Sequence, residues 1–181
     1  MKKNLVFAAV AVFAFALAAS AQDTNFSGTW NLDVSKSKIA GPPIESQTLT
    51  ISHTGPELKV DTTTKRGAPP AGAPQGPPPG GGGGGRGGMM GGGDGSTTYT
   101  LDGKAVKSQM QTQMGAMDIS TTAKLDGNKI EITRSVETPM GARSTTEKWT
   151  LQSDGTLTIE SQRPNRDGGT DTTTRVFTKN K

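Results

Sequence analysis

Residues 117–151 read MDISTTAKLDGNKIEITRSVETPMGARSTTEKWTL, and apolar and polar residues alternate along them in three successive runs. An alternation with a period of two is typical of antiparallel strands that bury one face. The Asp126-Gly127 step between the first two runs supplies the positive backbone angles of a tight hairpin turn. The pattern therefore predicts strands that fold back on their neighbours without crossover helices.

The same alternation continues on both sides of this region, and further Asp-Gly steps stand at 102–103 and 154–155. About ten strands are predicted, at residues 26–34, 47–53, 57–64, 97–101, 105–111, 118–125, 129–137, 144–151, 156–161 and 171–178. A meander of this size avoids exposed edges when its first strand pairs with its last. We therefore predict an all-β fold, a single up-and-down antiparallel meander that closes into a barrel of about 8–10 strands.

The first 21 residues have the composition of a secretory signal peptide. Lys2 and Lys3 precede an apolar run from Leu5 to Ala19, and small residues up to Ala21 form a cleavage site. The run is shorter than the roughly 20 residues that span a bilayer, and no second apolar segment follows it. Because the sequence has no cysteine, it can carry neither a disulfide nor a lipid anchor on cysteine. We expect cleavage after Ala21 and a secreted or periplasmic protein that is not lipid-anchored.

The mature chain, residues 22–181, is expected to form one domain with a single modest core. Loss of Lys2 and Lys3 with the signal peptide lowers the formal charge from +4 to +2. The remaining basic residues are spread singly among acidic residues and threonines, unlike the basic patch of a nucleic-acid-binding surface. We therefore expect no nucleic-acid partner and no transmembrane segment in the mature chain.

Residues 66–95 interrupt the alternation with 15 Gly and 6 Pro. A segment with so little apolar area cannot offset the backbone entropy of ordering its glycines. We predict a disordered Gly/Pro-rich loop inside the barrel domain, which a sheet tolerates because closure entropy rises slowly with loop length.

The first predicted strand contains Phe26-Ser27-Gly28-Thr29-Trp30, and Leu32 and Val34 continue its inward face. With Arg175 in the last strand, this segment resembles the opening of the calycins, the superfamily of lipocalins and fatty-acid-binding proteins. It also resembles a type of small secreted bacterial protein that begins Phe-x-Gly-Thr-Trp. The resemblance extends over residues 26–179 as a rhythm of strands.

This resemblance implies a barrel closed by a basic residue of the last strand that covers the Trp of the first strand. Here that pair is Arg175 over Trp30, with Gly28 allowing a close approach. Two features depart from the family pattern. Residues 35–44 are too short and too rich in Pro and Gly for the two helices of fatty-acid-binding proteins, and Arg175-Val176-Phe177 lacks the hydroxyl of their Arg-x-Tyr carboxylate anchor.

Fold analogy with these barrels implies a secreted lipocalin-like protein that binds a small, partly apolar ligand in the barrel interior. The expected contacts are inward-facing apolar residues. They are Trp30, Leu32, Ile51, Val60, Leu101, Ile119, Ile132, Trp149 and Phe177. We expect no enzymatic activity, no cofactor and no metal site. The alternative is a non-enzymatic envelope or surface interaction protein with a filled barrel, whose outer face or Gly/Pro loop meets a protein or a polysaccharide.

Three charged residues, Arg134, Glu147 and Arg175, share the inward parity of their strands if the alternation is unbroken. They either form an interior ion pair or polar ligand clamp, or a bulge shifts the parity and leaves them in solvent. We expect the second. The single histidine, His53, has no nucleophile or acid partner in the sequence pattern and is expected to be structural.

Six methionines offer thioethers that could bind Cu(I), but their spacing has no strict repeat. They are Met89, Met90, Met110, Met114, Met117 and Met140. We expect these side chains to fill irregular apolar space instead.

Overall fold

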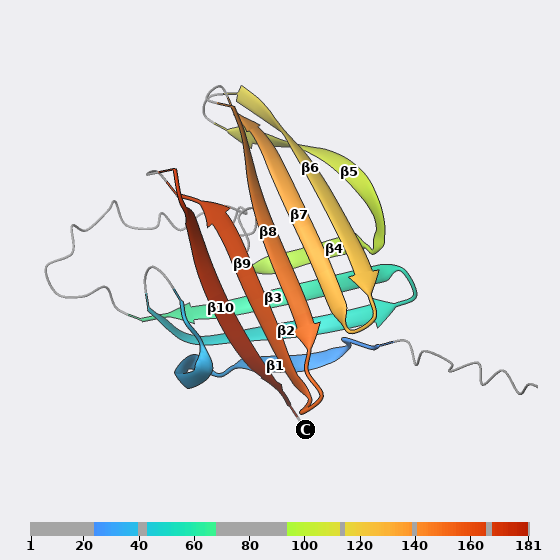
Figure 1. Cartoon of the computed structure of the whole chain (residues 1–181), viewed down its shortest axis with the longest axis vertical. Coiled ribbons are helices and arrows are strands. Elements are labelled where there is room, and N and C mark those ends of the chain that lie inside the picture. Colours follow the sequence, from blue (N-terminus) through green and yellow to red (C-terminus); the bar gives the residue numbers. More distant parts are fainter. Residues whose placement is uncertain are drawn as a thin grey trace, which may run out of the picture.

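A computed structural model describes residues 24–39, 43–67, 94–112, 115–138, 141–165 and 168–180 of the 181-residue chain (Figure 1). Its elements are β1 (Gly28–Leu32), the 3₁₀-helix η1 (Val34–Lys36), β2 (Ile44–Thr54), β3 (Glu57–Arg66), β4 (Gly95–Thr100), β5 (Asp102–Thr112), β6 (Gly115–Asp126), β7 (Lys129–Thr138), β8 (Gly141–Leu151), β9 (Thr156–Pro164) and β10 (Thr170–Lys179). The predicted signal peptide and residues 68–93 of the predicted loop lie outside the described residues.

The ten strands form one antiparallel sheet in the order β4-β3-β2-β1-β10-β9-β8-β7-β6-β5. The first strand therefore pairs with the last, with Trp30 opposite Lys179 and Leu32 opposite Phe177. In Figure 1, β1 to β4 form one layer, and β6 to β10 cross it as a second layer. The predicted all-β meander and the closure of the barrel through its terminal strands are confirmed.

The barrel stays open at one place, between β4 and β5. These strands follow each other in the chain with only Leu101 between them, yet they are the two edges of the sheet. The Leu101 N–H donates to the Pro56 carbonyl at 2.7 Å, whereas the Leu101 carbonyl accepts from Leu125 N–H at 3.5 Å. The chain thus passes at Leu101 from the β3 side to the β6 side, and β4 and β5 diverge from this point (Figure 1).

The Asp102-Gly103 step is a bulge, not the hairpin turn that the sequence predicts. The register of β5 against β6 shifts between Asp102 and Ala105, and Gly103 has a φ of 75°. An extra residue in one strand bends it and increases its twist. The bulge therefore turns β5 away from β4, whereas the predicted turns after Asp126 and Asp154 are both present.

The end of the first strand also differs from the prediction. Val34 was expected to face inward, but it lies in η1 and is 45% exposed. The Asp33 carboxylate accepts hydrogen bonds from the Ser35 and Lys36 N–H groups, which caps this turn and ends the strand at Leu32. A bridge between Lys38 and Thr174 then holds the following residues against β10.

The described residues contain no helix whose length and hydropathy would suit a membrane span.

Candidate ligand-binding site

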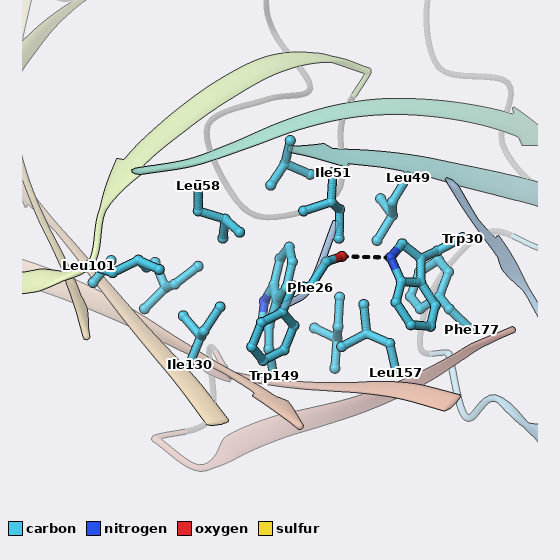
Figure 2. Close-up of a cluster of buried hydrophobic side chains, with 14 residues drawn as sticks. Phe26, Trp30, Leu49, Ile51, Leu58, Leu101, Ile130, Trp149, Leu157 and Phe177 are labelled. Atoms are coloured by element: carbon cyan, nitrogen blue, oxygen red, sulfur yellow. Dashed lines mark hydrogen bonds between the residues drawn. The ribbon is translucent and has the colours of Figure 1, made fainter. Parts of the chain in front are cut away.

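The inward faces of the strands form a packed apolar core, which Figure 2 shows in close-up. Most of the predicted ligand contacts belong to it: Trp30, Ile51, Val60, Leu101, Ile132, Trp149 and Phe177 lie in the core cluster, and Leu32 packs against it. Ile119 is buried as well and, with the core residue Ala123, lines a cavity between the diverging strands. Most of the predicted residues thus lie together in the core, where they contact one another. Their contact with a ligand stays a prediction.

The Trp30 ring is covered by Lys179, not by the predicted Arg175. Lys179 Nζ lies 5.3 Å from the ring centroid, within the range of a cation–π contact. The register explains the difference, because Lys179 is directly opposite Trp30, whereas Arg175 lies four residues earlier in β10. The indole N–H donates to the Phe26 carbonyl at 2.9 Å, which satisfies its polar atom inside the core (Figure 2).

Arg175 instead joins a buried ion pair with Glu147. Its Nη2 lies 3.4 Å from Glu147 Oε1, and the two side chains are only 8% and 10% exposed. The register of β8 with β9 and of β9 with β10 contains no shift, so no bulge moves these residues outward. The expectation that they would be solvated was wrong, and the interior ion pair is confirmed.

The ion pair is part of a hydrogen-bonded network that crosses the barrel interior. Arg175 also donates to Gln47 Oε1 at 3.2 Å and to Ser161 Oγ at 3.3 Å. Glu147 accepts from the Trp149 indole N–H at 3.2 Å and from the Ser161 hydroxyl at 3.3 Å. Both charges are therefore paired and hydrogen-bonded, as buried charges require.

The third charged residue, Arg134, faces the opening of the barrel. Its Nη2 donates to the Tyr99 hydroxyl at 3.4 Å, so the contact joins β7 to the edge strand β4. Both side chains are partly buried. Burial raises the pKa of the Tyr99 phenol above its usual value, although the nearby Arg134 charge opposes that rise. Tyr99 is thus a neutral phenol at pH 7.

A cavity of about 490 Å³ lies between β4 and the strands β5 to β7. This volume is within the range of small-molecule sites, about 300–1,000 Å³. Its lining combines apolar and polar side chains, among them Tyr99, Val106, Ile119, Thr121, Ala123 and Arg134. The cavity can therefore take a molecule with both an apolar and a polar part.

His53 is placed as a structural residue. Its Nδ1 accepts a hydrogen bond from the Phe26 N–H at 3.4 Å, and its ring meets the Phe26 ring edge-on at 5.9 Å. Its buried Nε2 has no hydrogen-bond partner among the described residues. The nearby Ser27 hydroxyl bonds to the His53 backbone and not to the imidazole, so this pair is no nucleophile and base.

Most of the methionines considered as Cu(I) ligands lie outside the described residues. Met110 and Met117 are paired across β5 and β6, whereas Met89, Met90, Met114 and Met140 are not described.

The sequence interpretation missed Gln47 and Tyr99. Gln47 is 1% exposed, and its inward position is visible in the parity it shares with Leu49 and Ile51. The same parity argument places Tyr99 inward two residues before Leu101. No local signal shows that Tyr99 meets Arg134, because that contact depends on how the barrel closes.

No family model matches the chain, and no curated protein matches it significantly. Among solved structures it is similar to the fluorescent protein UnaG, with 16% identity and a TM-score of 0.47 over 86% of this chain and 97% of that chain. It is also similar to secretory abundant heat soluble protein 4 from Ramazzottius varieornatus, with 13% identity and a TM-score of 0.45 over 87% of this chain and 96% of that one. Similarities of this size carry no argument about function.

Proposed function

We propose that this protein binds a small, partly apolar molecule in its barrel, at the opening between β4 and β5. The observation that carries the proposal is the cavity of about 490 Å³ beside Ile119 and Arg134. Its apolar lining offers burial for a hydrocarbon or ring, and its hydroxyl and guanidinium groups offer hydrogen bonds that fix orientation. The ten-stranded meander, open only between β4 and β5, is the scaffold that the resemblance to calycins implies.

We propose binding without catalysis. The Ser27 hydroxyl is engaged by the His53 backbone, and the His53 ring accepts a backbone N–H. The buried Glu147 is fully occupied by Arg175, Ser161 and Trp149. These groups support the structure and are not arranged as an acid, base or nucleophile towards the cavity.

The binding proposal is tested with the neutral fluorescent probe N-phenyl-1-naphthylamine. We expect saturable binding with one site, and we expect Val106→Trp to weaken it because Val106 lines the opening and is exposed enough to accept a larger ring. The matched control is Gln111→Trp, an exposed position on the other face of the same strand. Failure of the wild type to bind, or equal weakening by both variants, contradicts the proposal.

Export is the second part of the proposal, and it rests on the signal-like composition of residues 1–21. Expression with residues 1–21 intact in a bacterial host should yield a periplasmic or extracellular protein that begins at Gln22. Amino-terminal sequencing and fractionation check this, and an uncleaved cytoplasmic product would contradict it.

The alternative, an interaction protein with a filled barrel, is favoured by the packing of Trp30, Ile132 and Trp149 in one core cluster. In this alternative, a protein or polysaccharide partner would bind to the outer face of the barrel or to the Gly/Pro-rich segment.

A further inference from the structure

Met110 and Met117 lie directly opposite each other near the end of the β5–β6 hairpin. The next pair on the same face, two positions further from the turn, is Ser108 with Ile119. Residues two apart in a strand share a face, and Ile119 is buried inside the barrel. Both methionines therefore lie on the inward face of the sheet, at its rim.

These two methionines do not contribute to the apolar core of the described residues. Neither belongs to the core cluster or to the apolar residues that pack against it. Both side chains are partly exposed, whereas Ile119, two positions after Met117 in β6, is only 4% exposed. The inward face of the hairpin thus ends in two neighbouring thioethers that solvent can reach.

The separation of directly opposite residues suits two sulfur ligands on one metal ion. With a metal–sulfur bond of about 2.3 Å, the length found for zinc and cysteine sulfur, one ion can hold two sulfurs up to about 4.6 Å apart. Opposite residues of an antiparallel pair have Cβ atoms about 4.5–5.5 Å apart, and methionine adjusts through its rotatable bonds. The register therefore allows Met110 and Met117 to bind one ion without a change in the backbone.

The chemistry of this pair favours a soft ion. Thioether sulfur is a soft ligand that selects Cu(I), whereas carboxylates suit hard cations. Asp118 follows Met117 but lies on the opposite face of the strand, where its carboxylate accepts a hydrogen bond from the Gln109 amide at 2.9 Å. The part of the chain that the structure describes also holds no group of three or more His, Cys, Asp and Glu side chains that could bind a metal ion.

We propose that Met110 and Met117 form a binding site for Cu(I) at the rim of the barrel. The site is separate from the cavity of the proposed function, because neither methionine is among the described residues that line that cavity. An ion bound there would also connect the edge strand β5 to β6 through side chains. The copper site and the small-molecule site can therefore each be present without the other.

The test is isothermal titration calorimetry of the purified protein with Ag(I) in chloride-free buffer. Ag(I) is a soft ion that takes the place of Cu(I) without its redox chemistry. We expect wild-type protein to bind one Ag(I) per chain. The double variant Met110→Leu, Met117→Leu changes side-chain volume little. It should weaken binding by at least about tenfold, because even the loss of an outer-shell partner of a metal site costs about 10–100-fold in affinity.

The matched control is a fourfold variant that replaces the methionines outside the described residues, and it should keep the wild-type dissociation constant. Its substitutions are Met89→Leu, Met90→Leu, Met114→Leu and Met140→Leu. Zn(II) should not displace Ag(I), because the pair offers none of the thiolate, imidazole or carboxylate ligands of zinc. Circular dichroism shows whether each variant folds. In ¹³C-methyl NMR of wild-type protein, the signals of Met110 and Met117, assigned from the single leucine variants, should shift when Ag(I) is added.

Loss of Ag(I) binding in the double variant and its retention in the fourfold variant support the site. Wild-type protein that binds no Ag(I), a double variant that binds as well as wild type, or equal weakening in the two variants overturns it. Displacement of Ag(I) by Zn(II) overturns the thioether ligands. If the double variant does not fold, the NMR signals decide, and unshifted signals of Met110 and Met117 overturn the proposal. None of these outcomes bears on binding of N-phenyl-1-naphthylamine in the cavity.

Discussion

The Glu147 carboxylate is the negative charge around which the polar part of the barrel interior is arranged. It accepts hydrogen bonds from Arg175, Ser161 and Trp149, which come from three strands. A buried ion pair gives little net stability compared with apolar packing, but loss of one partner leaves an uncompensated charge. The network therefore makes the stability of the barrel depend on both charges being present together.

Replacement of Glu147 tests this dependence. Glu147→Gln keeps the shape of the side chain but leaves the Arg175 guanidinium buried without a carboxylate. We expect the free energy of unfolding to fall by about 3–5 kcal/mol, measured by urea denaturation. The matched control is Glu160→Gln, an exposed carboxylate on β9, which should change it by no more than about 0.5 kcal/mol.

The double variant Glu147→Leu, Arg175→Met removes both charges and should recover much of the loss. A single Glu147→Gln variant as stable as the Glu160→Gln control would show that the buried pair has no structural role.

At the scale of the elements, the seam between β1 and β10 depends on Gly28. Its φ of 137° lies in a region that side chains rarely adopt, and a Cβ there would lie 2.4 Å from Lys179 Cε. The Lys179 side chain can move, whereas the backbone angle cannot be relieved without shifting β1. The strand that carries Trp30 therefore begins at a position that only glycine adopts without strain.

We expect Gly28→Ala to lower the free energy of unfolding by about 1–3 kcal/mol, through backbone strain. The double variant Gly28→Ala, Lys179→Ala separates strain from collision. If backbone strain dominates, Lys179→Ala should change the free energy of unfolding by the same amount in the wild-type protein and in Gly28→Ala. Full recovery in the double variant would instead identify the Lys179 contact as the cause.

Three aspartates, in the turn at η1, in the β5 bulge and in the turn before β9, have pKa values below the usual one. The Ser35 hydroxyl lowers the pKa of Asp33, the Lys104 N–H lowers that of Asp102, and the Thr156 hydroxyl lowers that of Asp154. A carboxylate with a lowered folded-state pKa stabilises the fold above its unfolded pKa, near 3.8. This contribution disappears as the pH falls below 3.8 through the folded-state value.

The melting temperature should therefore fall as the pH drops below 3.8, because the three carboxylates lose their charge-assisted hydrogen bonds there. Asp154→Asn keeps an acceptor for Thr156 but cannot titrate, so its melting temperature should depend less on pH in this range. Asp61→Asn, an exposed carboxylate within β3, is the control. Equal pH dependence of Asp154→Asn and wild type would contradict the argument.

The elements themselves were largely predictable, because strand parity and Asp-Gly turns are local signals. Strand parity also placed Glu147 and Arg175 on the inward face, which is correct. The expectation of a bulge led to the wrong prediction that these side chains are solvated. A bulge lies instead at Asp102-Gly103, which has the same sequence signature as the turns at 126 and 154. An Asp-Gly step alone does not distinguish a hairpin from a bulge, since both use glycine with positive φ.

At the scale of the whole molecule, closure through β1 and β10 leaves the opening between β4 and β5. Closure follows from the number of strands and their single apolar face, so the sequence predicts it. The sequence does not predict the opening, because its position depends on Leu101, where the chain passes from the β3 side of the barrel to the β6 side. The contact of Arg134 with Tyr99 and the replacement of Arg175 by Lys179 over Trp30 are likewise consequences of register between distant strands.

Excision of residues 68–93 tests which of the two proposed functions applies. β3 ends at Arg66 and β4 begins at Gly95, and the Asp94 carboxylate accepts a hydrogen bond from the Thr64 N–H, so the strands that flank the excised segment are already paired. A short Gly-Ser linker should therefore preserve the barrel and its melting temperature, since closing a shorter loop costs less entropy.

The excised protein should bind N-phenyl-1-naphthylamine with an unchanged dissociation constant if the cavity beside Ile119 and Arg134 is the functional site. The control is a variant in which the sequence of residues 68–93 is scrambled, so that the length and composition of the segment stay the same. A folded excision variant that loses the neutral probe would show that the cavity site needs residues 68–93. Retention of probe binding together with loss of a protein or polysaccharide partner would favour the interaction function, because the barrel then supports a segment that makes the contact.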